Sequence, residues 1–268
     1  MDKAAALFRA SNVIRMDYPF AGALDGALQV CDEAVIVVDR KSQDDTLDLV
    51  YALQDDYGRD RVIIVEREWR FDRMWQETVW EWGMEATDAE WLMYHDADEA
   101  IHENDVPAVR ELMADPGVDL ICFPYLHHYG TPAFITRTYY PHNTRLGRRS
   151  AGYRMRNWCT DERPDRPACE MVWGPDERDA HNYRGPGLVV VDVPMHHYGW
   201  CRDAQALANG QARAADWYAD GQEYAEGPPP SHVEPVDFRL GEKRAAGTVE
   251  RYEGRETCEI LSGNGLPG

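Results

Sequence analysis

Short apolar runs alternate with amphipathic segments through the first half of the chain. Residues 34–38 form an apolar run that ends at Asp39, and residues 61–65 form a second run. Between them, residues 44–57 have the pattern of a helix that begins with acidic residues and ends at Gly58. This alternation of strand and helix predicts an α/β fold with a mostly parallel central sheet flanked by helices.

A second helix is predicted after residue 70, because apolar side chains recur there at helical spacing. Residues 90–94 then form a short apolar strand that runs directly into the acidic segment His95-Asp96-Ala97-Asp98-Glu99. Ligands of open α/β sheets bind outside the carboxyl ends of the strands, so this segment and Asp39 are expected at the binding edge. The side chains that form the apolar stripe on one face of the helix predicted after residue 70 are Phe71, Met74, Trp75, Thr78, Val79 and Trp82.

Later segments are less regular. A helix over residues 107–113 and strands over 120–123 and 188–193 follow the same pattern, but the alternation is lost beyond Tyr125. The alanine-rich stretch 204–218 favours a helix. From residue 226 onward, the sequence is polar and rich in glycine and proline, which predicts a tail or a lid.

Composition excludes a disordered chain and adds little about function. Hydrophobic residues make up 44% of the 268 positions, and the formal net charge is −20. The charge weighs against non-specific binding to nucleic acid. Six cysteines without a Cys-x-x-Cys pair, and the lack of a run of about 18 apolar residues, predict a soluble cytoplasmic protein without a transmembrane segment.

Arginines are concentrated in one region of this acidic chain. They pair with acidic residues elsewhere, or they form with nearby aromatic side chains a surface for phosphates and stacked rings. The region contains Arg137, Arg145, Arg148, Arg149, Arg154, Arg156, Arg163 and Arg166, with Tyr139, Tyr140, Tyr153 and Trp158 between them.

The acidic segment after residue 94 has the spacing of a metal site. Two carboxylates one residue apart, as in Asp96 and Asp98, can face a single cation if the backbone turns between them. Oxygen ligands suit Mg²⁺ or Mn²⁺, and the diphosphate of a bound nucleotide supplies further oxygens. The alternative is a solvated acidic turn with no ligand.

Several segments resemble inverting glycosyltransferases of family 2. The strand and turn Trp91 to Glu99 resemble their "W-x-L-x-x-D-A-D-E" pattern, and residues 31–46 resemble "C-D-E-V-V-V-V-D-x-x-S-x-D-x-T". Residues 12–20 resemble "R-N-x-x-x-x-D-Y-P-F", although Ser11 stands in place of the arginine. The segment His197-Tyr198-Gly199-Trp200 resembles the "H-Y-G-W" that closes the catalytic domain in some members.

The resemblance implies a GT-A fold, a nucleotide-sugar donor and a divalent metal, Mn²⁺ or Mg²⁺. Asp39 would contact the base of the donor, favoured as a UDP-sugar, although Arg40 replaces an acid often seen beside it. The remaining donor-site residues implied are Asn12, Asp44 and Asp96, and the metal ligands are Asp96, Asp98 and His197, with His196 as the competing histidine.

An inverting transfer needs a general base that takes the proton of the acceptor hydroxyl. Residues 152–164 resemble a strand followed by the family's "H-E-x-P", which places Glu162 at the glutamate and Asp161 at the histidine. Asp176 and Glu177 are alternative bases.

These features predict a metal-dependent, hexosyltransferase-like enzyme that transfers a sugar to a glycan, a lipid-linked sugar or a small molecule. Residues 1–225 would form the catalytic domain, with a donor half over 1–125 and an acceptor half over 126–225, followed by the tail 226–268. A hydroxylated base in DNA is an alternative acceptor. A non-catalytic nucleotide-sugar-binding module and a nucleotidyl- or phosphoryl-transferring enzyme are alternative functions, the last because such enzymes also use acids at strand ends with a divalent metal.

Overall fold

The inner strands of the chain are apolar on both faces, which suits a sheet that is covered by helices on both sides. Every residue of β2 (Glu33–Asp39) is buried, and all but one of β1 (Ala4–Ala10) are. The computed structural model describes residues 2–70, 75–136, 142–152, 154–156, 171–173, 187–203, 206 and 249–251.

Four parallel strands form the first part of the sheet, in the order β3 (Val62–Arg67), β2, β1 and β4 (Trp91–His95). Next to β4 lies β8 (His142–Arg148), which is antiparallel both to β4 and to the long strand β6 (Leu120–Tyr129) on its other side. The carboxyl ends of β1, β2 and β4 therefore lie at one edge, which is the edge at which ligands of such sheets bind.

Beyond Tyr125 the sheet continues, whereas the sequence pattern predicted a loss of regular structure there. The second half of β6 pairs with β7 (Thr131–Thr136) and in parallel with β12 (Met195–Trp200). Two short strands complete these pairings: β5 (Glu99–Ala100) beside β12, and β11 (Leu188–Val190) beside the start of β6. The polar histidines and tyrosines of these strands hid the apolar alternation on which the prediction depended.

Three further short strands lie outside this arrangement or at its margin. β9 (Arg154–Arg156) and β10 (Met171–Trp173) form a separate antiparallel pair. β13 (Val249–Arg251), within the predicted tail, pairs with β7. The predicted helix over 204–218 lies outside the described residues except for residue 206, which is helical.

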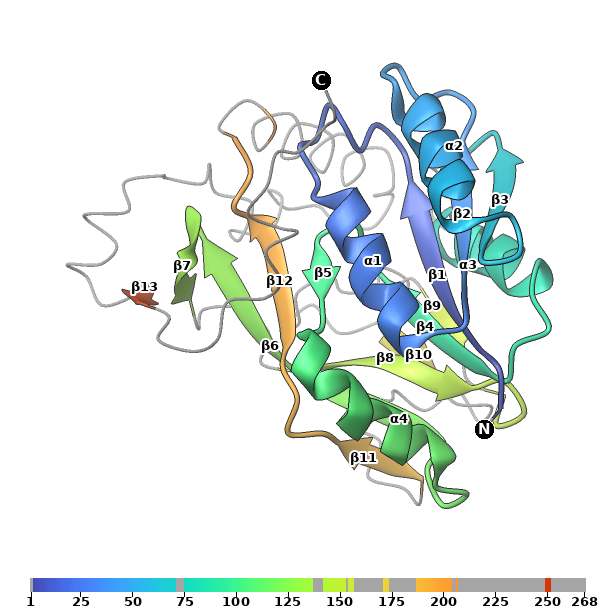
Figure 1. Cartoon of the computed structure of the whole chain (residues 1–268), viewed down its shortest axis with the longest axis vertical. Helices are drawn as coiled ribbons and strands as arrows, with labels where there is room; N and C mark the ends of the chain where they lie inside the picture. Colours follow the sequence, from blue (N-terminus) through green and yellow to red (C-terminus); the bar gives the residue numbers. More distant parts are fainter. Residues whose placement is uncertain are drawn as a thin grey trace, which may run out of the picture.

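Helices cover both faces of the sheet (Figure 1). On one face lie α1 (Phe20–Val30), α2 (Thr46–Tyr57) and α4 (Val106–Ala114), which follows the 3₁₀ turn η1 (Glu103–Asp105). On the other face lies α3 (Trp75–Glu85). Because side chains alternate along a strand, β1 supplies Phe8 to the first layer and Leu7 to the second.

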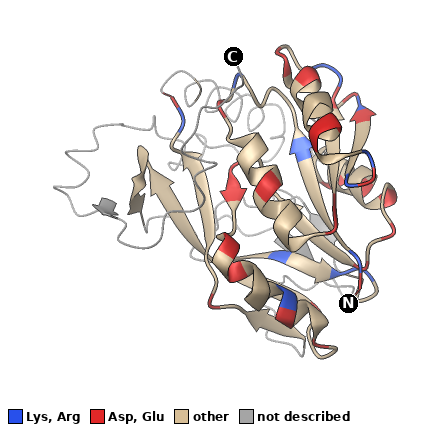
Figure 2. Cartoon of the chain, in the orientation of Figure 1, with Lys and Arg blue, Asp and Glu red and all other residues tan. Residues whose placement is uncertain are grey.

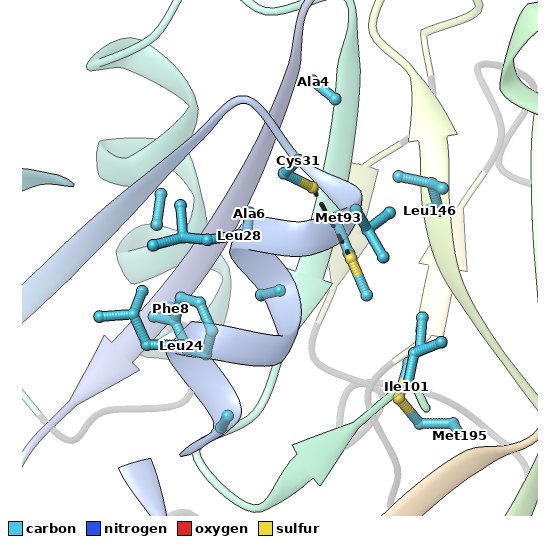
Figure 3. Packing of buried hydrophobic residues seen from close by; sticks show 14 of the residues in the cluster. Ala4, Ala6, Phe8, Leu24, Leu28, Cys31, Met93, Ile101, Leu146 and Met195 are labelled. Atoms are coloured by element: carbon cyan, nitrogen blue, oxygen red, sulfur yellow. Dashed lines mark hydrogen bonds between the residues drawn. The ribbon is translucent and has the colours of Figure 1, made fainter. Parts of the chain in front are cut away.

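The first layer is the larger core, and Figure 3 shows its packing between α1 and the sheet. Phe8 on β1 packs beside Leu24 and Leu28 of α1, and the ring of Phe20 meets that of Phe8 edge to face at 5.5 Å. Fully burying side chains of this size contributes about 1.5–3 kcal/mol each. This layer fixes α1, and with it the loop that precedes it, against the carboxyl end of β1.

The α3 helix differs in part from the predicted stripe. Val79 of the stripe is buried, but the fully buried tryptophan is Trp80 and not Trp82, which is partly buried. Gly83 faces the sheet, and a Cβ there would make ordinary van der Waals contacts, at 3.4 Å from Cγ2 of Val37 and 3.6 Å from Cδ2 of Leu7. Phe71 and Met74 lie outside the described residues.

Many of the acidic residues lie on the helices (Figure 2). On α2, Asp48, Asp55 and Asp56 are exposed, which contributes to the net charge of −20. Within the described ranges, Cys31, Cys122 and Cys201 are free thiols. Among the helices that the structure describes, none combines the length and the apolar character needed to cross a bilayer.

Candidate functional site

Two loops at the carboxyl edge of the sheet are joined by Asn12 and Asp44. Asn12 has a positive φ of 54°, and its Oδ1 accepts a hydrogen bond from the backbone N–H of Gln43 at 2.7 Å. Asp44 accepts from the backbone N–H of Arg15 at 2.7 Å and from that of Thr46 at 3.1 Å. Asp44, which precedes the N-cap residue Asp45, thus binds the first N–H of α2 while it holds the loop after β1. Both predicted donor-site residues lie at the expected edge, where they fix the loops.

Asp39 ends β2 and is 2% exposed. One of its oxygens accepts from Oγ of Ser11 at 3.1 Å, and the other from the backbone N–H groups of Lys41 at 3.0 Å and Trp69 at 3.2 Å. Ser11, which stands in place of the family's arginine, therefore positions this carboxylate. The three donors keep a buried carboxylate satisfied at the strand end.

Asp96 lies between two arginines from different strands. Its Oδ1 accepts from Nη2 of Arg9 on β1 at 2.7 Å, and its Oδ2 accepts from Nη2 of Arg145 on β8 at 2.5 Å. Burial acts to raise the pKa of Asp96, but the positive charges of Arg145 and Arg9 outweigh it and hold the pKa well below its ordinary value. Asp96 is therefore a permanent anion.

Arg145 is itself part of a buried network. It is 2% exposed, and the same Nη2 reaches Oε1 of Glu99, which is fully buried, at 2.5 Å. Tyr125 completes the group, because its hydroxyl accepts from Nε of Arg145 at 2.6 Å and donates to Oε1 of Glu99 at 2.6 Å. The other oxygen of Glu99 accepts from the backbone N–H of Asp96 at 3.2 Å. These bonds fix the backbone of the turn that carries Asp96 and Asp98.

Asp98, two residues further on, has the opposite electrostatic environment. Burial, together with the negative charge of Asp96, raises the pKa of Asp98 to about 7. Its backbone carbonyl accepts from the N–H of Tyr198, which attaches the turn to β12. A buried carboxylate that is destabilised in this way gains from a neighbouring cation.

His197 on β12 lies beside Asp98, the residue with which the sequence analysis expected it to share a metal. The distance from Nε2 of His197 to Oδ2 of Asp98 is 3.8 Å. Burial lowers the pKa of His197 to about 4, which keeps the ring neutral. Two atoms that each lie about 2.1 Å from one Mg²⁺ ion are at most about 4.2 Å apart, so this spacing is within the limit for two ligands of one cation.

Gly199 leaves room beside these two atoms. A Cβ at this position would lie 2.8 Å from Oδ2 of Asp98 and 2.9 Å from Nε2 of His197. Any side chain there would collide with both candidate ligands. The carboxylate, the neutral imidazole and the absent side chain together fit a divalent cation whose remaining ligands come from a bound diphosphate. The described residues contain no cluster of three His, Cys, Asp or Glu side chains that could hold a metal unaided.

Histidines occur in pairs on the two strands that carry this side of the site. His127 and His128 lie on β6, and His196 and His197 lie on the neighbouring strand β12, where His197 is paired with His127. Nδ1 of His127 lies 3.1 Å from Nδ1 of His197, and Nε2 of His128 lies 2.9 Å from Nδ1 of His196. His196, the competing ligand in the sequence, therefore pairs with His128, and His197 is the histidine that faces Asp98.

Arg202 lies close enough to Asp98 for its positive charge to counteract part of the rise in the pKa of that carboxyl. Its guanidinium donates to the backbone carbonyls of Gly199 at 2.8 Å and Met16 at 3.0 Å, and it stacks over the ring of Tyr18 at 4.3 Å. Arg202 thereby connects the end of β12 to the loop between β1 and α1. Because its bonds are to uncharged carbonyls, its positive charge is available to an anion.

Most of these partner residues were missed by the sequence analysis. Arg9 and Tyr125 lie in apolar strands and belong to no short motif, and Glu99 was noted only as the last residue of the acidic segment. Arg145 was noted only as one of a group of arginines. Of that group, Arg145, Arg148 and Arg149 bind carboxylates and backbone carbonyls of the same chain, so these three pair internally.

The proposed general bases cannot be placed. Glu162 and Asp161, and the alternatives Asp176 and Glu177, lie outside the described residues. The structure therefore brings together Asp96, Asp98 and His197, with Asn12, Asp39 and Asp44 along the same edge of the sheet.

A family profile described as Glycosyl transferase family 2 matches residues 23–170. A search of curated proteins found no match. Among solved structures, a mannosyltransferase from Pyrobaculum calidifontis, in complex with GDP-Man and Mn²⁺, is 18% identical, with a TM-score of 0.49. That alignment covers 92% of this chain and 72% of the mannosyltransferase.

Two other solved structures are similar over about half of this chain. TarS from S. aureus, in complex with UDP-GlcNAc, is 16% identical, with a TM-score of 0.37 over 48% of this chain. The glucosyl-3-phosphoglycerate synthase from Mycobacterium tuberculosis, with Mn²⁺ and UDP, is 17% identical over 49% of this chain, with a TM-score of 0.34. The alignments cover 36% of the TarS chain and 46% of the synthase.

Proposed function

The chain belongs to glycosyltransferase family 2, and from this premise we propose that it transfers a sugar from a nucleoside-diphosphate sugar to an acceptor hydroxyl. Its sheet flanked by helices is the GT-A fold that the sequence predicted. The acceptor would be a glycan, a lipid-linked sugar or a small molecule, and the donor a UDP-sugar.

One observation carries this proposal: Asp98 and His197 face each other across the space that Gly199 leaves, at the carboxyl edge of the sheet. We propose that these two side chains hold Mn²⁺ or Mg²⁺ together with the diphosphate of the donor. When bound, such a metal neutralises the negative charge that develops on the departing nucleoside diphosphate. Asp96 contributes a fixed negative charge beside them, held in place by its two arginines.

The remaining donor-site residues follow the order of the strands. Asp39 ends β2, one strand beyond β1, whereas Asp98 follows β4 on the other side of β1. Neighbouring strands are about 4.8 Å apart, so these two strand ends are separated by about 10 Å. In the proposed arrangement, Asp39 contacts the base of the donor, and the loops fixed by Asn12 and Asp44 lie along the nucleoside.

Arg202 is the residue we place beside the departing diphosphate. Its positive charge acts at Asp98, and within the described part of the chain its hydrogen bonds go to the backbone carbonyls of Gly199 and Met16. An arginine in this position stabilises a diphosphate by charge-assisted hydrogen bonds, which are the strongest that a side chain offers to phosphate.

The donor site is tested by measuring the release of nucleoside diphosphate from a panel of nucleotide-sugars with Mn²⁺, for the wild type and Asp98→Asn. We expect turnover of at least one donor by the wild type and a loss of about 100-fold or more in the variant, because the charge that holds the cation is removed. Asp55→Asn, which removes an exposed carboxylate on α2, is the matched control and should behave as the wild type.

Equal turnover by the wild type and Asp98→Asn would contradict the metal role of Asp98. If no nucleotide-sugar is bound or turned over, the chain is a member of the family without transferase activity of this kind, and the proposal fails.

Inversion at the transferred sugar is part of the same proposal and needs a general base. We propose Glu162 in this role, with Asp161 beside it, on the sequence resemblance alone. Glu162→Gln should leave donor binding intact and abolish transfer, since the amide cannot accept the proton of the acceptor hydroxyl. If transfer is unchanged, the role passes to Asp161, Asp176 or Glu177, which the corresponding amides would identify.

We propose that residues 1–125 form the donor half of the catalytic domain and that residues 126–225 form the acceptor half. Since β8 lies between β4 and β6, and Arg145 on β8 holds Asp96, the second half also supports the donor site. The segment 226–268 remains proposed as a tail or lid.

A further inference from the structure

Two parallel strands place four histidines at the side of the site. Alternate side chains of a strand point to opposite faces, so the two neighbouring histidines of each strand have their rings on opposite faces of the sheet. His127 and His197 contact each other beside Asp98, and His128 and His196 contact each other on the reverse face. Only the first pair can act on the candidate metal site.

We propose that His127 is a positioning residue, which holds His197 in the tautomer whose Nε2 presents a lone pair to the cation shared with Asp98. The inference rests on the proposed function, because it concerns the same metal site. His127 itself touches neither donor nor metal in this role, and it acts through His197.

The hydrogen bond between the two rings contains one proton, carried by one of the two Nδ1 atoms. Nδ1 of His127 and Nδ1 of His197 are 3.1 Å apart, a hydrogen-bond distance, so one nitrogen donates and the other accepts. A metal on Nε2 of His197 requires that this nitrogen carry no proton, which leaves the proton of the neutral ring on Nδ1. His127 must then accept through its Nδ1 and carry its own proton on Nε2.

The surroundings hold both rings in this arrangement. His127 is 2% exposed, and its ring meets that of His197 edge to face at 5.0 Å. The ring of Tyr125 lies 5.6 Å from that of His127 and 6.3 Å from that of His197. Because the Tyr125 hydroxyl is bound to Arg145 and Glu99, this contact couples the histidine pair to the network under the acidic turn.

The reverse face offers a matched comparison. Nδ1 of His128 lies 2.8 Å from the backbone carbonyl of Pro132, which can only accept, so His128 donates there and accepts at Nε2 from His196. A backbone carbonyl therefore sets the proton of that pair. His128 has the same strand, residue type and burial as His127 and differs in the face to which its side chain points.

The test is the affinity for Mn²⁺ in the presence of UDP, measured by calorimetry on the full chain at constant pH. His127→Leu should bind Mn²⁺ about 10-fold to 100-fold more weakly than the wild type, the range found when a partner of a metal-binding histidine is removed. His127→Asn should restore most of the affinity, because its Oδ1 offers an acceptor at the position of Nδ1. His128→Leu should leave the Mn²⁺ affinity within about 2-fold of the wild type, since the second pair faces away from the site.

A second readout does not depend on metal. In metal-free protein with ¹⁵N-labelled histidine, long-range ¹H–¹⁵N spectra should show His197 with its proton on Nδ1 in the wild type and in His127→Asn. In His127→Leu this preference should be lost. Both measurements are made below the thermal unfolding temperature of each variant, which circular dichroism establishes.

The outcomes separate the two claims. If the wild type binds Mn²⁺ and His127→Leu binds it equally well, or if His197 carries its proton on Nε2 in the wild type, the role of His127 is wrong and the metal site stands. If the wild type binds neither Mn²⁺ nor Mg²⁺ with UDP, the proposed metal site fails and the role of His127 fails with it.

Discussion

At the scale of single residues, two carboxylates one residue apart have opposite properties. Asp96 is bonded to Arg9 and Arg145, which keep it ionised. Asp98 is buried next to that fixed charge, which raises its pKa to about 7. The spacing of the motif could not distinguish the two, because the difference comes from arginines on β1 and β8. The carboxylate that a cation would stabilise most is Asp98.

The raised pKa of Asp98 predicts that the affinity for Mn²⁺, measured in the presence of UDP, increases with pH. Below a pKa of about 7 the proton competes with the metal, so affinity should rise about 10-fold per pH unit up to pH 7 and then level off. His197, with its pKa lowered to about 4 by burial, stays neutral throughout this range. Calorimetry between pH 5.5 and 8 measures the slope, and affinity that is flat over this range would show that Asp98 is ionised throughout.

The absence of a side chain at residue 199 gives a second prediction. Gly199→Ala places a Cβ within 3 Å of both candidate ligand atoms, so Asp98 and His197 must move apart or the cation must leave. We expect a loss of about 10-fold or more in Mn²⁺ affinity. Gly199 has no positive φ that requires glycine, so the loss of stability should be limited to the cost of moving the two side chains, about 1–3 kcal/mol. Gly117→Ala, where the added Cβ would meet only the side chain of Asp115 at 3.2 Å, is the control. Unchanged affinity in Gly199→Ala would place the cation elsewhere.

At the scale of elements, β8 is the strand that secures the acidic turn. It lies antiparallel between β4 and β6 and brings Arg145 under the residues that follow β4. Burying a charge is costly unless it is paired, and here one arginine is shared by Asp96 and Glu99 with Tyr125 closing the network. The strand thus links a distant part of the sequence to the geometry of the site.

Removing Arg145 should destabilise the fold. Arg145→Met leaves Glu99 buried without its cation, for which we expect a loss of about 3–5 kcal/mol in the free energy of unfolding, measured by urea denaturation. Lys41→Met removes an exposed pair with Glu68, where both side chains are more than 60% exposed, and should change stability by less than about 1 kcal/mol. A small effect of Arg145→Met would mean that Glu99 is protonated or rearranged in the folded chain.

At the scale of the whole molecule, four of the described histidines are buried and neutral. Burial lowers the pKa of His128 to about 4, that of His196 to about 3 and that of His197 to about 4, and it also lowers that of His95. In the unfolded chain each of these side chains has a pKa of about 6.5. As pH falls below that value the unfolded state takes up protons that the folded state does not, so acid favours unfolding.

Asp98 has the opposite effect on the free energy of unfolding as pH falls, so the net change is the difference between its contribution and that of the histidines. With a folded pKa of about 7, above its unfolded value, Asp98 stabilises the fold at low pH and loses this contribution as pH rises toward 7. Four histidines outweigh this one carboxyl, so the metal-free chain should lose at least about 2 kcal/mol of unfolding free energy between pH 6.5 and 5.5. Urea denaturation at both pH values measures the change. Equal stability at the two values would mean that these rings titrate normally in the folded state.

How much of this followed from the sequence can be stated element by element. The strands over 33–39 and 91–95 and the helices over 46–57 and 106–114 agree with the predictions to within a few residues, because each depends on local apolar periodicity and on stops such as Gly58. The extension of β6 to Tyr129 was missed, since its histidines and tyrosines lie in a strand only through pairing with β7 and β12.

By itself, the sequence determined the class of fold and the positions of Asp39, Asp96 and Asp98 at strand ends, since apolar patterning decides where strands stop. It also indicated His197, through a resemblance of four residues. Only the tertiary structure decided that Arg9 and Arg145 hold Asp96, that Asp98 faces His197 beside Gly199, and that His127 adjoins the pair. These contacts join residues that are 49 to 101 positions apart in the sequence, so they depend on strand order and register, which local patterns do not encode.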